Sequence, residues 1–169
     1  MTSKKIGFVL WAILFLSSIL YLIATYETMP DRIAVQFDVN NKPIRWQNKH
    51  GFFAWHLCLL LGLNLIFLSI QLYLSKIRDS LINVPWKDYW FSTPERKSTA
   101  LTMMKTALVY AGVFINFTYL LVYHVIYQEN VSGAFPRVSV DTAVYSVLLL
   151  SLILVIGLFW YMKPPKQGI

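Results

Sequence analysis

The chain has 169 residues, of which 57% are hydrophobic and 14% charged, and its formal net charge is +7. Soluble domains carry about 25% charged residues, so a composition this apolar excludes an ordinary water-soluble globule. The length permits one domain, residues 1–169, and no nucleic-acid-binding motif accompanies the positive charge, so we expect no nucleic-acid partner.

Four long stretches without a charged residue predict transmembrane helices. Each stretch is long enough to cross a hydrocarbon core of about 30 Å, and its continuous apolarity excludes barrel strands. The first stretch is longer than the roughly 7–15 apolar residues of a signal peptide, which favours a retained helix. We therefore expect an all-α membrane protein with helices at about residues 6–25, 52–74, 94–127 and 143–162.

The loop at residues 27–50 carries a strand pattern. Ile33, Val35 and Phe37 alternate with other residues, residues 39–43 are typical of a turn, and residues 44–46 can pair back. This pattern predicts a short β-hairpin-like element. The loop at residues 129–141 contains a second alternating run at residues 137–140, so a small sheet that uses both loops is plausible.

The loop at residues 76–93 interleaves aromatic and basic residues, and Trp and Tyr favour the headgroup region of a bilayer. We therefore expect this segment to lie on the membrane surface. At its end, Ser92 and Glu95 match a capping box and Pro94 suits the first turn of a helix, so the third helix is expected to begin near Pro94.

The distribution of Lys and Arg predicts the orientation. With the N-terminus inside, twice as many of these residues face the cytoplasm as face the outside. Such an excess is typical of cytoplasmic loops. We therefore expect both termini and the loop 76–93 to be cytoplasmic, the loops 27–50 and 129–141 to be external, and the chain to cross the membrane several times.

Polar residues occur near the middle of each predicted helix: Asn64 in the second, Asn116 in the third, Ser17 in the first and Ser151 in the fourth. A bare amide in hydrocarbon costs several kcal/mol. We therefore expect Asn64 and Asn116 to face the bundle interior and to hydrogen-bond to each other or to the serines. A polar binding site or permeation path at this depth is the functional alternative.

The motifs at residues 29–33, 37–38 and 42–46 with Lys49, and at 82–85, 89–90 and 94–96, resemble a known family. This is a bacterial four-helix membrane domain of unknown function, also found as the N-terminal part of SdpI-type toxin-immunity proteins. Gln36 stands where that family usually has histidine, and Asn41 where it has a turn glycine. The resemblance implies a non-enzymatic, multi-pass protein of a bacterial inner (plasma) membrane.

The residues that match this family pattern in the external loop are the candidate partner-binding residues: Pro30, Phe37, Asp38, Trp46 and Lys49. Exposed loops carry function more often than buried elements do. We expect the loop to sense, or protect against, an extracytoplasmic peptide or amphiphile, with the bilayer as the other partner. The alternative interpretation is that these residues only fold the loop.

Two other classes of function remain as alternatives, a small transporter and a metal-dependent enzyme of the outer leaflet. No charged residue lies within the four apolar stretches, whereas intramembrane charges usually mark ion pathways. His50, His56 and His124 occur near the external loops, but without the ligand spacing of a zinc site. We therefore expect no catalytic residue, no metal and no cofactor.

Overall fold

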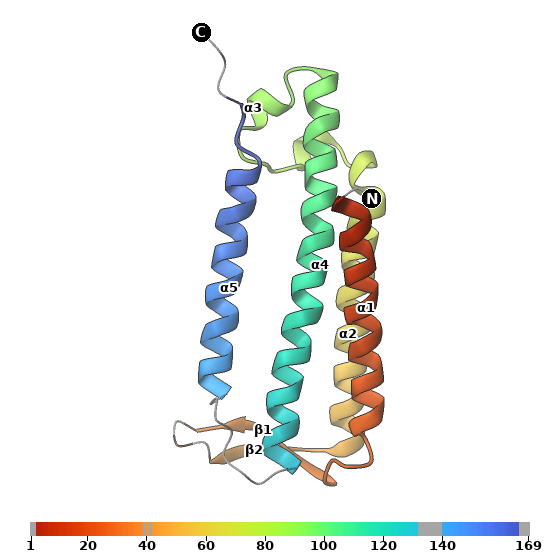
Figure 1. Cartoon of the computed structure of the whole chain (residues 1–169), viewed down its shortest axis with the longest axis vertical. Helices are drawn as coiled ribbons and strands as arrows, with labels where there is room; N and C mark the ends of the chain where they lie inside the picture. The colour runs from red at the N-terminus through yellow and green to blue at the C-terminus, as the bar shows by residue number, and fades with distance from the viewer. Residues whose placement is uncertain (1–2, 39, 41, 132–139, 166–169) are drawn as a thin grey trace.

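The computed structural model describes residues 3–38, 40, 42–131 and 140–165. Four long helices run side by side along the long axis of the molecule (Figure 1). They are α1 (Ser3–Thr25), α2 (Lys49–Tyr73), α4 (Pro94–Val131) and α5 (Val140–Tyr161). The chain ends lie toward the same end of the bundle as the short helix α3 (Lys87–Trp90), opposite the strands β1 and β2.

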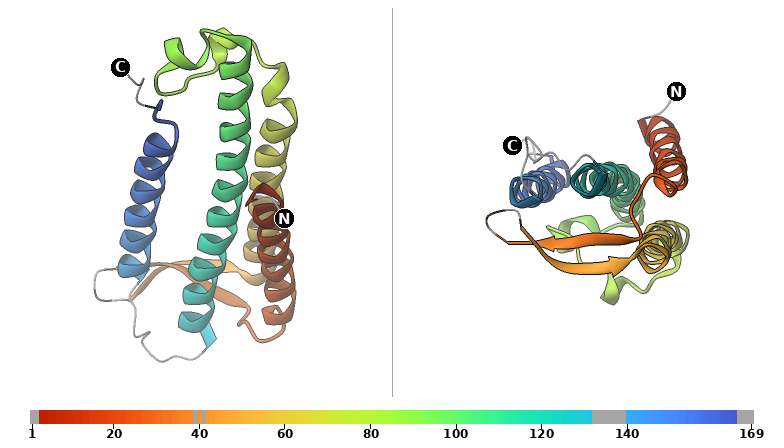
Figure 2. Two further views of the ribbon diagram at one scale, coloured as in Figure 1. Left: turned by 45° about the horizontal axis from the view of Figure 1, so that its top comes forward. Right: turned by 90° about the horizontal axis from the view of Figure 1, so that it is seen from below.

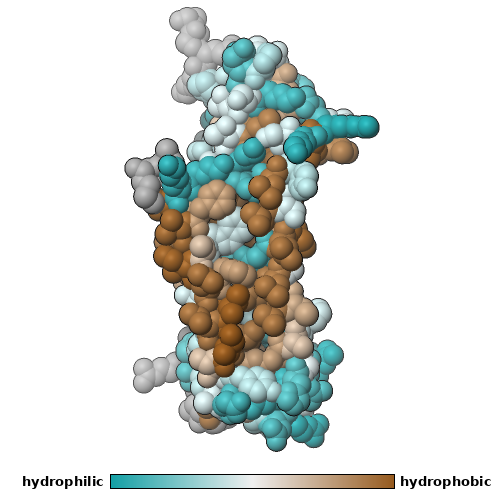
Figure 3. All heavy atoms as spheres, turned by 90° about the vertical axis from the view of Figure 1, so that its right-hand side faces the viewer, coloured by the Kyte–Doolittle hydropathy of each residue, from teal (hydrophilic) through white to brown (hydrophobic). Residues whose placement is uncertain are grey.

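Three of the described helical segments are long and apolar enough to cross a membrane: Ser3–Thr25, Lys49–Lys76 and Pro94–Val131. A broad hydrophobic band separates two hydrophilic ends on the face formed by α1 and α2 (Figure 3). These features agree with a membrane protein. In α5 the apolar part described with its side chains, Tyr145–Tyr161, is shorter, so a fourth span stays a prediction.

The predicted hairpin is present. β1 (Arg32–Phe37) and β2 (Pro43–Asn48) pair antiparallel, and Ala34 lies opposite Trp46. The hairpin lies across the lower end of the bundle in Figure 1, and Figure 2 shows it from below. The second strand-like run was predicted at residues 137–140. Residues 137–139 lie outside the described residues, and Val140 begins α5.

The hairpin is anchored in the main hydrophobic core. Ile33 is fully buried (0% exposed) and joins a cluster at the hairpin end of α1, α2 and α4. The fully buried Tyr123 of α4 lies in the same cluster, and its hydroxyl is 2.6 Å from the Thr25 hydroxyl of α1. The hairpin therefore packs on the helices mainly through Ile33 and Ala34 of β1, whereas β2 stays largely exposed.

The close approach of α1 and α4 depends on two glycines. A Cβ on Gly112 of α4 would lie 2.7 Å from the Trp11 ring, and one on Gly7 of α1 would lie 2.7 Å from Val109. Both separations are too short for real side chains. Small residues at such positions let membrane helices approach closely, and here they seat Trp11 against α4.

The loop between α2 and α4 forms two short 3₁₀ helices, η1 (Leu74–Lys76) and η2 (Asp79–Leu81), and then α3. Its place on the membrane surface stays a prediction. Ile82, Val84 and Trp90 are buried in a second cluster with Ala100 and Met162. The Trp90 indole donates to the Met162 carbonyl at 2.9 Å. The segment therefore packs against the neighbouring ends of α4 and α5.

The start of α4 differs from the expected capping box by one residue. The helix begins at Pro94, and the Arg96 amide donates to the Thr93 hydroxyl at 3.3 Å. Ser92 instead donates to the Tyr89 carbonyl, because α3 has only just ended there. With 38 residues, α4 is about 57 Å long and connects the second cluster to the hairpin.

Candidate functional site

The two mid-helix asparagines meet in the bundle interior. The Asn64 amide of α2 donates to the Asn116 side-chain oxygen of α4 at 3.1 Å, and Asn116 donates back at 2.9 Å. Asn116 is fully buried (0% exposed). Each amide also donates to a carbonyl four residues earlier, Leu60 for Asn64 and Gly112 for Asn116. The structure therefore brings this predicted pair together.

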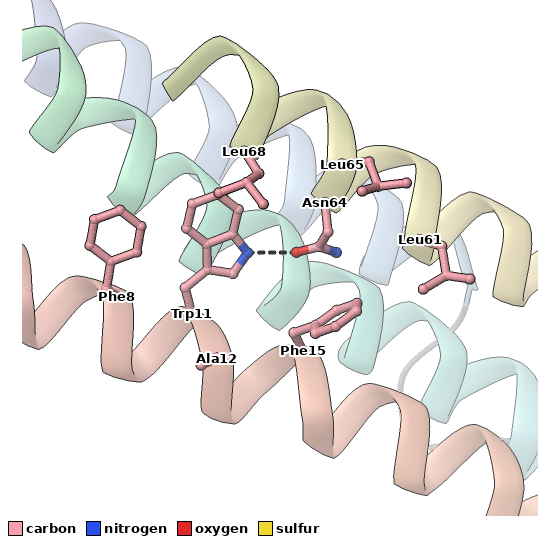
Figure 4. A pocket seen from close by; sticks show the side chains of 8 residues that line it. All are labelled: Phe8, Trp11, Ala12, Phe15, Leu61, Asn64, Leu65 and Leu68. Atoms are coloured by element: carbon pink, nitrogen blue, oxygen red, sulfur yellow. Dashed lines mark hydrogen bonds between the residues drawn. The ribbon is translucent and has the colours of Figure 1, made fainter. Parts of the chain in front are cut away.

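A third residue joins the pair from α1. The Trp11 indole N–H donates to the Asn64 oxygen at 2.5 Å (Figure 4). We call Trp11, Asn64 and Asn116 the central polar group. An asparagine side chain offers two acceptor sites and two donor hydrogens. All four are engaged on Asn64, because its oxygen accepts from Trp11 and Asn116 while its amide donates to Asn116 and Leu60.

The serines do not join this group. Ser151 of α5 donates to the Val147 carbonyl of its own helix at 2.7 Å. Ser17 of α1 is half-buried, and its neighbour Ser18 donates to Leu14 at 2.8 Å. Serines commonly bond to the preceding turn in this way. Of the two expected arrangements, the asparagines therefore adopt the one in which they bond to each other.

A cleft of about 320 Å³ lies beside the central polar group, between α1 and α2. Figure 4 shows Phe8, Phe15 and Leu61 around it, with Asn64 facing Trp11. Because the amide of Asn64 is fully engaged, it leaves no free donor or acceptor for a ligand in the cleft. The hydrogen bonding at this depth therefore supports helix packing rather than recognition.

The five candidate residues of the hairpin do not form one site. Pro30 precedes β1 and Lys49 follows β2, whereas Phe37 and Asp38 stand at the opposite end of the strands. Asp38 accepts from the backbone amides of Asn40 (2.9 Å) and Lys42 (2.7 Å), which holds the turn. For Asp38, the interpretation as a folding residue accounts for every contact that we observe.

Lys49 also has a structural role. Its backbone amide donates to the Asp31 carbonyl at 2.9 Å, which closes the base of the hairpin. Its ammonium nitrogen lies 4.8 Å from the centre of the Tyr26 ring, a distance typical of a cation–π contact. Of the five candidates, Trp46 differs most clearly, because it is a large aromatic that remains 48% exposed on β2.

Trp46 lines a hollow of about 600 Å³ between the hairpin and the helices. We call it the hairpin hollow. Its lining residues come from both strands, α2 and α4: Val35, Arg45, Trp46, Gln47, Phe52, Trp55, His56 and Ile126. Trp55 is 61% exposed, so two indoles border the hollow. Of these residues, only Trp46 was a partner-binding candidate from the sequence, because the hollow depends on how the strands lie against α2 and α4.

The electrostatics of the hairpin hollow are unbalanced. Among the described residues that line it, Arg45 is the only charged one and none is a carboxylate. Among the described residues, the one salt bridge joins Lys97 and Asp79 at the opposite end, so Arg45 has no such partner there. The Nδ1 atom of His56 is buried without a hydrogen-bond partner, while its ring lies 4.2 Å from Phe52. Buried polar atoms normally have a partner.

Asn130 of α4 holds the hairpin in place over this hollow. Its side-chain oxygen accepts from the Ala34 amide at 2.7 Å, and its amide donates to the Ala34 carbonyl at 3.0 Å. This mimics the pairing of a neighbouring strand and explains why Ala34 is buried. The sequence signal was its place four helical turns beyond Asn116, on the same face of α4.

The three histidines do not converge. His50 lies 2.6 Å from the Tyr26 hydroxyl, and His124 lies 2.6 Å from the Tyr21 hydroxyl. His56 faces the aromatic core instead. In the part of the chain that the structure describes, no three His, Cys, Asp or Glu side chains are grouped closely enough to hold a metal ion.

Residues 13–61 match the family described as "Domain of unknown function (DUF1648)". The matched segment covers most of α1, the hairpin and the first half of α2, so it includes the strands and α2 residues of the hairpin hollow. No curated protein and no solved structure matches the chain. The resemblance to a domain of unknown function is thereby confirmed for this segment, while the link to toxin-immunity proteins stays a prediction.

Proposed function

We propose that the chain is a bacterial inner-membrane protein with four crossing helices, cytoplasmic termini and an external hairpin. The excess of Lys and Arg on the side of the termini supports this orientation. The 22 residues of α5 are enough for a fourth crossing. In this orientation the hairpin hollow opens on the outer face.

Cysteine labelling tests the orientation. With Cys58 replaced, a cysteine at Lys42, which is exposed beside the hairpin turn, reacts in intact cells with an impermeant reagent. A cysteine at Lys87, in α3, reacts only after the membrane is permeabilised. Labelling with the opposite preference contradicts the proposed topology.

The chain functions, in this proposal, as a non-enzymatic binding protein that senses or protects against an extracytoplasmic peptide or amphiphile. The observation that carries the proposal is the hairpin hollow with Trp46 and Trp55 exposed at its border. Indoles offer a large rigid apolar surface and one donor, which makes Trp a frequent anchor of binding sites. In contrast, the central polar group offers no free hydrogen-bonding position on Asn64.

The test uses a strain that lacks the gene and shows altered growth with extracytoplasmic peptides or amphiphiles. The wild-type gene should restore growth, whereas the double variant Trp46→Ala/Trp55→Ala should fail to restore it at equal expression. Trp160→Ala is the matched control, because Trp160 is similarly exposed (62%) on α5, outside the hollow. Full restoration by the double variant refutes the binding role of the hollow.

A further inference from the structure

The lining of the hairpin hollow divides into two chemical kinds. Arg45 and Gln47 of β2 and His56 of α2 provide a cation, an amide and an imidazole. The remaining lining residues are aliphatic or aromatic: Val35, Trp46, Phe52, Trp55 and Ile126. A ligand that fits both kinds carries hydrogen-bond acceptors at one end and an apolar body at the other.

The charge of the lining determines which charge the polar end of a ligand should carry. Arg45 brings a permanent positive charge, and no carboxylate balances it among the lining residues that the structure describes. Arginine pairs well with carboxylate and phosphate because its guanidinium presents several donors in one plane. His56 adds a buried nitrogen that lacks a partner. Within this described lining, a cationic ligand would find no counter-charge, whereas an anionic one would find Arg45.

The size and position of the hollow favour a small amphiphile over a peptide or a folded protein. Its volume of about 600 Å³ lies within the roughly 300–1,000 Å³ of small-molecule sites. A stable protein partner would instead need about 800 Å² of surface on each side. One wall is α2, a helix apolar enough to cross a membrane, so the hollow adjoins a segment that suits the apolar part of an amphiphile.

We propose that the hairpin hollow binds a single-chain amphiphile with an anionic head, which contacts Arg45 while the hydrocarbon chain lies against Trp46 and Trp55. This inference rests on the proposed function and specifies its ligand class. Gln47 donates its amide to the same head group, and Val35 and Ile126 flank the chain. Asn130 is a positioning residue, because it fixes the strand that carries Val35.

Photo-crosslinking in phosphatidylcholine nanodiscs tests the ligand class. The probe is a 12-carbon fatty acid with a diazirine near the end of its chain, and the matched probe is the amine of the same chain length. Mass spectrometry of labelled peptides should locate the carboxylate probe on β1, β2 and the start of α2. The amine should label these peptides at least tenfold less.

Variants assign the charge to one side chain. Arg45→Gln should reduce labelling by the fatty acid about tenfold, as expected for the loss of a charge-assisted hydrogen bond. Arg45→Lys should retain most of it. Arg32→Gln, which removes an equally exposed cation of the hairpin outside the hollow, is the matched control and should label normally. A melting temperature equal to that of the wild type confirms that the Arg45 variants are folded.

Three outcomes would overturn the inference. Equal labelling by the acid and the amine would show that the hollow does not prefer an anionic head group. An equal loss of fatty-acid labelling in the Arg45→Gln and Arg32→Gln variants would show that Arg45 is not the specific contact. Complete competition by an acidic peptide without an acyl chain assigns the site to peptides instead. Each of these outcomes leaves the proposed function intact, because that function is judged by whether the Trp46/Trp55 variant restores growth.

Discussion

The central polar group and the hairpin hollow both place polar side chains among aromatic ones, but they differ in how those polar atoms are satisfied. On Asn64, each donor and acceptor has a protein partner between 2.5 and 3.1 Å away. In the hollow, Arg45 has no carboxylate partner among the described residues and the Nδ1 atom of His56 has no hydrogen bond.

This difference separates packing from recognition. An amide surrounded by hydrocarbon is stabilised by protein partners, as Asn64 is, because lipid provides none. Once both of its groups are engaged, it orients helices and cannot also hold a ligand without breaking those bonds. At the hairpin, where β2 reaches water, polar groups can remain open. We infer that unsatisfied polar groups in a concave site, rather than polar groups as such, indicate a binding function in this chain.

The largest expected effect concerns the helix contact that seats Trp11 in the central polar group. Gly112→Val should destabilise the protein by about 1–3 kcal/mol, the usual cost of overpacking, since even a Cβ there would lie 2.7 Å from the indole. Gly62→Val is the matched control on α2, because nothing lies within 4 Å of a Cβ at that position. Unfolding in mixed detergent micelles measures both variants, and equal stability would contradict the tight α1–α4 contact.

A more local effect is expected where the hairpin is held to α4. Asn130→Ala removes two hydrogen bonds to Ala34, each worth about 0.5–1.5 kcal/mol. Hydrogen exchange of the Ala34 amide should accelerate at least tenfold, while exchange in the middle of α4 stays slow. Asn130→Asp keeps the oxygen that accepts from the Ala34 amide but loses the donor to the Ala34 carbonyl. The exchange rate of the Ala34 amide in this variant should therefore lie between those of the wild type and the alanine variant. Unchanged exchange in the alanine variant would show that other contacts hold the hairpin.

The smallest expected effect is the coupling between Asn64 and Asn116. Hydrogen bonds between membrane helices contribute about 0.6 kcal/mol on average and at most about 1.7 kcal/mol. The single variants Asn64→Leu and Asn116→Leu and the double variant form a cycle, and the unfolding free energies should give a coupling in this range. Strict additivity would mean that the two amides do not stabilise each other, and the central polar group would then require another explanation.

Hydrophobic patterning was enough to predict the helices and the hairpin. Long uncharged runs have few alternatives to a helix, and the alternation at Ile33, Val35 and Phe37 required one buried face. The Asn64–Asn116 contact followed from the depth of both residues. Their partner Trp11 was not predicted, because a tryptophan in an apolar helix looks the same whether it faces lipid or a buried amide.

The candidate site was predicted only in part. Family-like motifs directed attention to the hairpin, but Asp38 and Lys49 turned out to make local folding contacts. The hairpin hollow depends on how β2 lies against α2 and α4, and no local pattern encodes this arrangement. Asn130 determines that arrangement through the backbone of Ala34, and a backbone partner leaves no trace in the sequence of the strand.

The most direct test of the division between packing and binding compares two variants by the same pair of measurements. Labelling by the fatty-acid probe and melting temperature are recorded for Trp46→Ala/Trp55→Ala and for Asn116→Leu. We predict that the tryptophan variant loses labelling while its melting temperature is unchanged. The asparagine variant should have a lower melting temperature but normal labelling at temperatures where it is folded. Normal labelling of the tryptophan variant, together with lost labelling of the folded Asn116→Leu variant, would place binding at the central polar group and contradict this account.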